Sequence, residues 1–335
     1  MKAKRIVISS IAILMIAVLV SLVSCSREGD GEESSDAVFY TVTFNSNGGS
    51  QIEPRQVIAG GAVSEPAEPV RDGFIFDGWY RGTQKWDFEH KKVEGDVTLD
   101  ARWTDAETVF EHQPIDSQTT KITKLKKRSD NIRVPSVIGG YEVVAIGERV
   151  FADLSFGEIE SITVSASVRS IGEEAFDNCE GIEVVIEGQL THIGESAFLD
   201  CNGLSAVSFG EGLQVIPAQA FSGCSALKSV RIPSTVSVIE ENAFDRCSSL
   251  ATAMLYAHIS SIEDSAFNGT ALKTVYFYGT DDAVEALIDG GAVADKNEKL
   301  IDAKILIYSR SAPMGETVYD GYWYLDENNK TREWK

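Results

Sequence analysis

The sequence predicts a mainly β protein, in which a small β-rich module precedes a solenoid of six coils and a capping segment closes the C-terminal end. One observation is a motif that recurs six times, in which an Ile lies five residues before the Phe of an Ala-Phe or Val-Phe pair. Its Phe returns at intervals of 25, 22, 23, 23 and 23 residues. Strand-like alternation precedes the repeats, and the period stops after them. A period near 23 with fixed apolar positions is typical of a solenoid whose stacked coils share one core.

Composition restricts the function classes. The formal net charge of the 335 residues is −21, and a leader with three cations and no acid leaves the remainder at −24. Such a chain has no electrostatic means of holding nucleic acid phosphates, so DNA and RNA are excluded as partners. The sequence has no HExxH arrangement, phosphate loop, GxSxG elbow or CxxC pair. We therefore expect no enzyme, no metal and no cofactor.

The N-terminal residues predict export. Three cations in the first five residues precede an almost unbroken apolar run over 6–23, which fits a signal peptide or an anchoring helix. Residues 22–25 (LVSC) resemble the bacterial lipobox, which implies a signal peptide over 1–24 and lipidation of Cys25. Ser26, where an Asp would imply retention in the inner membrane, implies the outer membrane. The alternative is an uncleaved anchor with a chance cysteine.

Residues 25–38 are Gly, Ser and acids, which predict a flexible tether. Residues 39–104 then alternate in the strand manner, in the order TVTFNSNGG, GGAV, GFIFDGWY, KWDF and VTLDARW. This order resembles the Listeria–Bacteroides repeat, also called the internalin B-repeat, and implies a compact β-rich spacer or interaction domain. Trp79, Tyr80 and Trp86 suit either its core or a sugar-stacking platform, and the core interpretation is the commoner one in so small a domain.

Residues 105–118 are polar and acidic, and we expect a linker there. From Thr119 a partial coil should cap the open end of the solenoid. Its basic cluster is either a solvated cap face or a binding patch. The cluster consists of Lys121, Lys124, Lys126, Lys127 and Arg128.

Within each coil, the apolar positions predict a short helical turn with an inward Phe, followed by a strand. The six phenylalanines are Phe151, Phe176, Phe198, Phe221, Phe244 and Phe267. The pattern IxxxAFxxCxxLxxVxIPxxVxxI resembles the BspA-type leucine-rich repeat over roughly residues 119–280. That family consists of bacterial and protist surface proteins, and the resemblance implies adhesion.

Four coils carry a cysteine three residues after the Phe, namely Cys179, Cys201, Cys224 and Cys247. Neighbouring coils would bring the sulfurs close enough for disulfides, which exported proteins often form. Leu154 and Thr270 occupy the same position in the other two coils. A small buried side chain explains all six positions, so we favour free thiols over bridges.

The strand positions that point outward are the expected ligand face of the solenoid. They are mostly small and hydroxylated, with aromatic residues and Met toward the C-terminal end, which suits a broad protein contact. The candidate residues are Thr163, Ser208, Arg231, Met254, Tyr276 and Tyr278. Ser161 and Ser165 are assigned to the same outward face.

Residues 281–335 should form the C-terminal cap. Asp281 to Leu287 reads as a short helix, 303–309 as a strand and 322–334 as a hairpin. The ending resembles that of many BspA-type proteins, and it would protect an edge that otherwise invites sheet association.

Together these features predict a lipid-anchored bacterial surface protein that binds extracellular or host proteins, with adhesion to host matrix, host cells or other microbes. One alternative is a structural envelope lipoprotein without a host ligand. Another is a glycan-capturing lipoprotein of an uptake system that uses Trp79, Trp86 or the Tyr276/Tyr278 pair.

Overall fold

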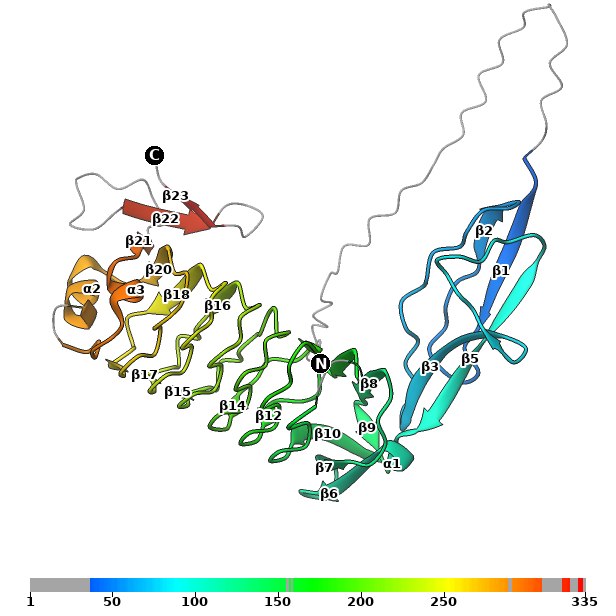
Figure 1. Ribbon diagram of the computed structural model, residues 1–335, viewed down its shortest axis with the longest axis horizontal. Coiled ribbons are helices and arrows are strands. Elements are labelled where there is room, and N and C mark those ends of the chain that lie inside the picture. The colour runs from blue at the N-terminus through cyan, green and yellow to red at the C-terminus, as the bar shows by residue number, and fades with distance from the viewer. Residues whose placement is uncertain are drawn as a thin grey trace, which may run out of the picture. The chain divides into compact units, whose positions relative to one another are not determined.

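The computed structural model describes residues 37–154, 157, 159–288 and 291–308, and the backbone of strands 321–325 and 331–333 (Figure 1). The expected signal peptide, Cys25 and the tether up to residue 36 lie outside the described residues. From Phe39 onward the chain forms one compact unit. The fold is mainly β, with a small β-rich module ahead of a solenoid, and this prediction is confirmed.

The N-terminal module is a five-stranded sheet in the order β2-β1-β5-β3-β4. Only the β1–β5 pair is parallel, with Val42 opposite Val97. Its core gathers around Trp79, whose ring meets Phe44 edge-on at 5.0 Å. The strands are β1 (Phe39–Asn45), β2 (Arg55–Ile58), β3 (Phe74–Arg81), β4 (Gln84–Lys85) and β5 (Val97–Asp105).

The linker expected over 105–118 is wrong. Residues Ala106–Val109 form α1, whose N-cap Asp105 accepts the Glu107 N–H, and Phe110–Pro114 form β6. Strand β6 pairs antiparallel with β7 (Thr119–Leu125), and the buried Phe110 ring lies 6.3 Å from that of Phe151. The open apolar end of the first coil has to be covered, and this polar-looking segment does so.

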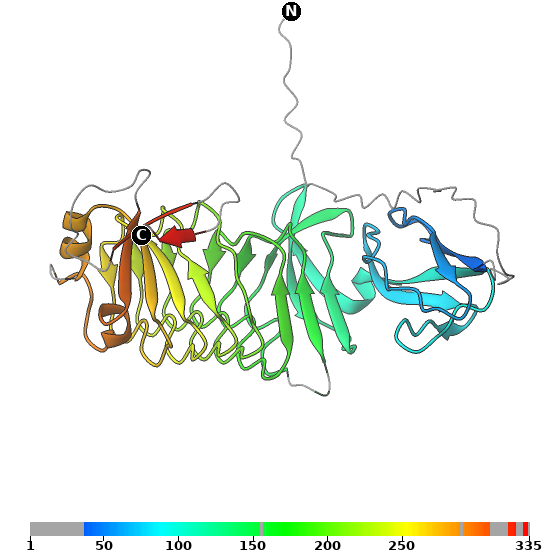
Figure 2. The same ribbon diagram turned by 90° about the horizontal axis from the view of Figure 1, so that it is seen from above.

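Two sets of parallel strands then run along the solenoid, and Figure 2 shows strands of successive coils side by side. On one side, β7, β10, β12 and β14 share a sheet, in which Ile146 pairs with Ile171 and the short hairpin strand β9 joins β10. On the other side, β8, β11 and β13 form a three-stranded sheet. The bounds are β8 (Asn131–Val134), β9 (Val137–Ile138), β10 (Tyr141–Ile146), β11 (Ser161–Val164), β12 (Ser170–Ile171), β13 (Glu183–Ile186) and β14 (His192–Ile193).

Both sets of parallel strands are interrupted after β13 and β14 and continue from β15 and β16. The strand expected over 204–209 is absent, and isolated bridges at Leu204 and Phe209 take its place. In this irregular coil the Phe209 ring meets the Phe221 ring edge-on, with centroids 5.6 Å apart. The later strands are β15 (Val215–Ile216), β16 (Ser229–Arg231), β17 (Val238–Ile239), β18 (Thr252–Tyr256), β19 (Ser261–Ile262) and β20 (Thr274–Tyr278).

The third side of each coil carries the repeated Phe. All six rings are fully buried, and successive rings from Phe151 to Phe267 stack with centroids 5.0–5.3 Å apart. Each Phe N–H from Phe151 to Phe244 donates to the Ala carbonyl of the next coil, as Phe176 does to Ala197 at 2.8 Å. The Phe column is therefore also a hydrogen-bonded ladder between coils.

The helical turn expected around each Phe is replaced by hydrogen-bonded turns. The residues two before and two after every Phe have positive φ, for example Glu174 at 50° and Asn178 at 57°. Both donate their N–H groups to the next coil, to Glu195 and Leu199. A helix would use these donors within its own coil, so the contact between coils dictates the left-handed backbone.

The C-terminal cap contains the expected helix, strand and hairpin. It consists of α2 (Asp281–Ile288), α3 (Glu298–Ile301), β21 (Lys304–Tyr308), β22 (Gly321–Leu325) and β23 (Thr331–Glu333). Strands β21 and β22 extend the sheet in parallel after β20, and β23 closes it in an antiparallel pair.

The hydrogen-bonded ladder between coils ends at the last coil with the side chain of Asn297, a residue that the sequence did not single out. Its Oδ1 accepts the Phe267 N–H at 2.9 Å, in place of the carbonyl that a further coil would supply. Its Nδ2 donates to Glu263 O at 2.8 Å and Ala294 O at 3.0 Å.

Candidate functional site

The outer face of the sheet β16-β18-β20-β21 gathers most of the predicted ligand residues. Alternation assigns the faces: Ala253 and Leu255 are buried in the core, while Thr252, Met254 and Tyr256 are half-exposed on the other side of β18. Because the strands are parallel and in register, equivalent residues form columns across the strands. Arg231, Met254 and Tyr276 share one column.

A second column consists of stacked tyrosines. The rings of Tyr256 and Tyr278 lie 4.6 Å apart and are 5° from parallel. Tyr278 also meets Tyr308 at 4.5 Å, with a tilt of 37°. The backbone of Tyr308 pairs in register with that of Trp323 on β22. Three coil-like strands thus present aromatic side chains at one position.

The two columns are joined by a hydrogen bond. The exposed Arg231 guanidinium donates from Nη2 to the Tyr256 hydroxyl at 3.1 Å. Burial among the neighbouring rings raises the pKa of Tyr278 above its usual value. A third column, two residues before Arg231 along β16 and at the paired positions of β18 and β20, carries hydroxyl groups. It consists of Ser229, Thr252 and Thr274. We call the residues Arg231, Met254, Tyr256, Tyr276, Tyr278 and Tyr308 the tyrosine face.

The structure does not unite all the predicted residues. Thr163 lies on β11, in a different sheet, and Ser208 is exposed in the coil that lacks a strand. Ser165, expected to point outward, is 5% exposed and donates to the Pro135 carbonyl at 3.2 Å. Sequence reasoning missed Tyr256 and Tyr308, although Tyr256 follows Met254 by two residues as Tyr278 follows Tyr276.

The repeat cysteines lie inside the solenoid. Cys179, Cys201, Cys224 and Cys247 are free and have no exposed surface. Three of them donate S–H to the Phe carbonyl of the preceding coil, as Cys179 does to Phe151 O at 3.0 Å. Burial raises the pKa of the Cys179 and Cys247 thiols to about 12, so they are poor nucleophiles.

Trp79 and Trp86 of the N-terminal module do not form a sugar platform. Trp79 and Trp86 are 1% and 5% exposed and belong to the core, so the hypothesis that they bind glycans is wrong. Tyr80 is half-buried, and the Arg102 guanidinium lies 4.1 Å from its ring centroid. So few residues cannot build a core and also expose their largest rings.

Among the described residues, no group of three or more His, Cys, Asp or Glu side chains is arranged to hold a metal ion. The same part of the chain has no helix that is long and apolar enough to span a membrane. Of the four histidines, His90, His192 and His258 are exposed, and His112 contacts the Thr120 hydroxyl at 3.0 Å.

Comparison with known families identifies both parts of the chain. Residues 169–285 match the BspA type leucine rich repeat region in six copies. Residues 40–102 match the Listeria-Bacteroides repeat domain. Both resemblances predicted from the sequence are confirmed.

Similar proteins share segments of this chain. A putative Gly-rich membrane protein of Evansella cellulosilytica is 45% identical over 67 residues, and Internalin H of Listeria monocytogenes is 38% identical over 69. Each match covers 19% of this chain but only 8% and 12% of those proteins.

Two solved structures are also similar. A leucine rich cell surface protein of Faecalibacterium prausnitzii has a TM-score of 0.49 and 24% identity, covering 68% of this chain and 59% of its own. The T. pallidum leucine rich repeat protein has a TM-score of 0.47 and 25% identity, covering 59% and 94%.

Proposed function

Because the chain contains a Listeria–Bacteroides repeat domain followed by BspA-type leucine-rich repeats, we propose that it is a bacterial cell-surface protein that binds other proteins and acts in adhesion. Its partners are extracellular proteins of a host matrix, of host cells or of other microbes. The proposed modules are the repeat domain over 39–104, the solenoid over 119–280 and the cap over 281–335.

The tyrosine face is the observation that carries the proposal. Tyr, Arg and Met are enriched at protein interfaces, where large rings add contact area at little cost in conformational entropy. Arg231, Met254, Tyr256 and Tyr276 provide these side chains on adjacent parallel strands. Regular pairing holds them on a rigid support, which lowers the entropy lost on binding.

The same geometry favours a protein partner over a glycan. A sugar stacks on the open face of an aromatic ring, and both faces of Tyr278 are occupied by Tyr256 and Tyr308. Because stacking covers ring faces in this column, ring edges and hydroxyl groups are the contacts that it can offer a partner. Edges and hydroxyls suit hydrogen bonding and packing against a broad, shallow surface.

Attachment to the envelope is proposed to occur through lipid on Cys25, probed by the change Cys25→Ala. This variant should appear in the soluble fraction, whereas the unchanged chain should partition with membranes. A variant that stays in the membrane fraction would contradict lipidation. The names of the relatives that share the repeat domain, a membrane protein and an internalin, support a surface location.

The binding experiment uses immobilised extracellular matrix proteins and a glycan array, probed with the full chain and with the double variant Tyr256→Ser/Tyr278→Ser. Thr163→Ala, which alters the sheet face on β11, is the matched control. We expect binding to a protein ligand that falls at least about tenfold in the double variant and stays unchanged in the control. Equal binding by all three proteins would reject the tyrosine face, and binding to glycans alone would reject the protein partner.

A further inference from the structure

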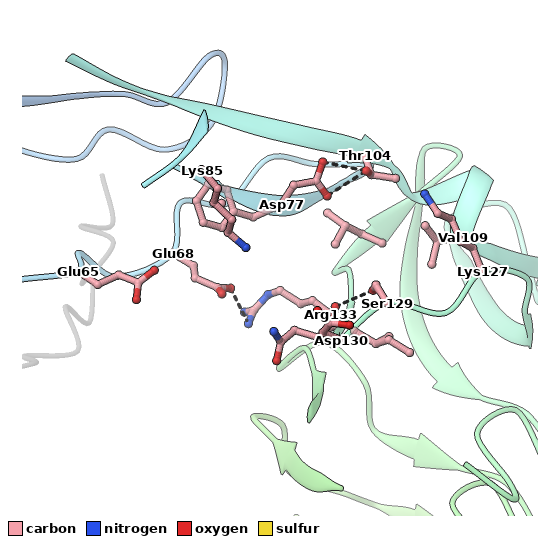
Figure 3. Close-up of a pocket in the computed structure, with 15 residues that line it drawn as sticks. Glu65, Glu68, Asp77, Lys85, Thr104, Val109, Lys127, Ser129, Asp130 and Arg133 are labelled. Atoms are coloured by element: carbon pink, nitrogen blue, oxygen red, sulfur yellow. Dashed lines mark hydrogen bonds and ion pairs between the residues drawn. The ribbon is translucent and has the colours of Figure 1, made fainter. Parts of the chain in front are cut away.

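A cleft lies where the N-terminal module meets the cap of the solenoid, away in sequence from the tyrosine face. It has a volume of about 420 Å³, which is within the usual size of a small-ligand site. Figure 3 shows Glu65, Glu68 and Lys85 of the module, and Lys127, Asp130 and Arg133 of the cap, around this hollow. No motif in the sequence pointed to it.

The floor of the cleft is apolar. It is lined by Ile75 of β3, Val109 of α1 and Ile132 of β8, which are 8%, 6% and 3% exposed. Ile75 belongs to the solenoid core cluster, not to the core of its own module. The three side chains form a small apolar surface that an aliphatic side chain of a ligand can cover.

The rim of the cleft carries charges of both signs. The module contributes Glu65, Glu68 and Asp77 against one cation, Lys85, while the cap contributes Lys127 and Arg133 against one acid, Asp130. The two walls are therefore of opposite net charge. A ligand that bears a cation toward the module and an anion toward the cap would match them.

Some of these charges are already used within the chain. Arg133 lies 3.0 Å from Glu187 and 3.6 Å from Glu68, so it links the two walls and separates the cleft from a neighbouring hollow of about 210 Å³. Asp77 accepts the Thr104 hydroxyl at 2.9 Å. Within the described part of the chain, Glu65, Lys85, Lys127 and Asp130 form no ion pair with one another or with other residues.

From the apolar floor and the unpaired charges of both signs, we infer that this cleft binds a short peptide segment in which an aliphatic side chain lies between a basic and an acidic residue. The basic side chain faces Glu65 on the module, and the acidic side chain faces Lys127 on the cap. This inference extends the proposed protein binding to a second site, and it stands on residues that the tyrosine face does not use.

The test measures peptide binding by calorimetry to the full chain solubilised in mild detergent. The probe is acetyl-Lys-Leu-Asp-amide, compared with acetyl-Gln-Leu-Asn-amide, which lacks both charges, and acetyl-Lys-Ser-Asp-amide, which lacks the aliphatic group. We expect the probe to bind with a Kd of about 1 mM or tighter, and each comparison peptide to bind at least about tenfold more weakly. Equal binding of the three peptides, or none, would overturn the inference.

Matched double variants then locate the site. Glu65→Gln/Lys127→Met removes one charge from each wall, and Glu111→Gln/Lys124→Met makes the same changes in an exposed pair at 3.8 Å on the cap, outside the cleft. The first should weaken probe binding at least about tenfold and the second should leave it unchanged. Unchanged binding by the first variant contradicts the assignment. Tyr256→Ser/Tyr278→Ser should retain peptide binding, so this inference and the proposed adhesive face can fail separately.

A photoreactive leucine in the probe gives a second readout that does not depend on any variant folding. Cross-links to Ile75, Val109 or Ile132 are expected, because these side chains line the floor. Cross-links confined to other segments would overturn the inference.

Discussion

Replacing Asn297 by Ala removes the residue that ends the ladder of hydrogen bonds between coils. Asn297 is 1% exposed, and its side chain makes four hydrogen bonds to backbone groups of the last coil and its cap, three at 2.8–3.0 Å and one, to the Asp295 carbonyl, at 3.4 Å. The Phe267 N–H is buried, and in Asn297→Ala it loses its acceptor. An unsatisfied buried donor costs about 1–3 kcal/mol, and the three carbonyls that lose the Nδ2 donor add to this. We expect the free energy of unfolding to fall by about 2–4 kcal/mol.

The assay is urea denaturation followed by circular dichroism, together with hydrogen exchange at Phe267. Asn268→Ala is the matched control, since Asn268 lies in the same coil but is exposed, and its side chain donates one hydrogen bond, to Asp245 at 2.8 Å. Its change should cost less than about 0.5 kcal/mol. Exchange at Phe267 should accelerate in Asn297→Ala alone. Equal destabilisation by the two variants, with Phe267 still protected, would refute the view that a side chain completes the ladder.

Three further predictions follow from the burial of aromatic and thiol groups. Phe221→Ala, in the middle of the stack, should cost about 3–5 kcal/mol in urea denaturation, and a cost below 1 kcal/mol would contradict a tightly packed Phe column. Burial raises the pKa of Cys179 and Cys247 from about 9 to about 12, so the folded chain holds protons that unfolded thiols release. The free energy of unfolding should therefore fall as pH rises from about 9 to about 12, and less so with Ala at both positions. Rapid modification of Cys179 or Cys247 in the native chain by thiol reagents at pH 8 would contradict this burial. Trp79→Ala should unfold the N-terminal module, seen by loss of its near-ultraviolet circular dichroism, while binding at the tyrosine face persists; a folded module would contradict its place in the core.

The solenoid was predictable because its constraint is repeated six times. The fixed Ile, Phe and Leu positions indicate a hydrophobic core that each coil shares with its neighbours. The local backbone was not predictable in the same way. Glu174 and Asn178 adopt left-handed φ because of bonds to the following coil, and Glu has no local preference that announces this conformation.

The roles of the residues that connect the modules and cap the solenoid could not be predicted from the sequence. Residues 106–114 look polar, yet Val109 and Phe110 cover the first coil, and only the exposed core end explains why. The role of Asn297 is likewise not marked by the sequence around it, because its two partners in the last coil, Phe267 and Glu263, lie 30 and 34 residues away.

The candidate site was predicted in part. Parallel register brings Arg231, Met254, Tyr276 and Tyr278 onto one sheet, as alternation suggested. Thr163 was assigned to the same face because the sequence did not reveal the irregular coil at 204–209 that divides the sheets. The cleft between the N-terminal module and the cap joins residues as far apart in sequence as Glu65 and Arg133, so no local pattern pointed to it.

Surface display is the central claim, and it is tested most directly by labelling intact cells with a membrane-impermeant amine reagent. Lys85, Lys228 and Lys273 are exposed and report on the N-terminal module and the solenoid. If the protein is displayed on the cell surface, these lysines should be labelled as fully in intact cells as in lysed cells. Labelling that appears only after lysis would contradict the proposed adhesive role.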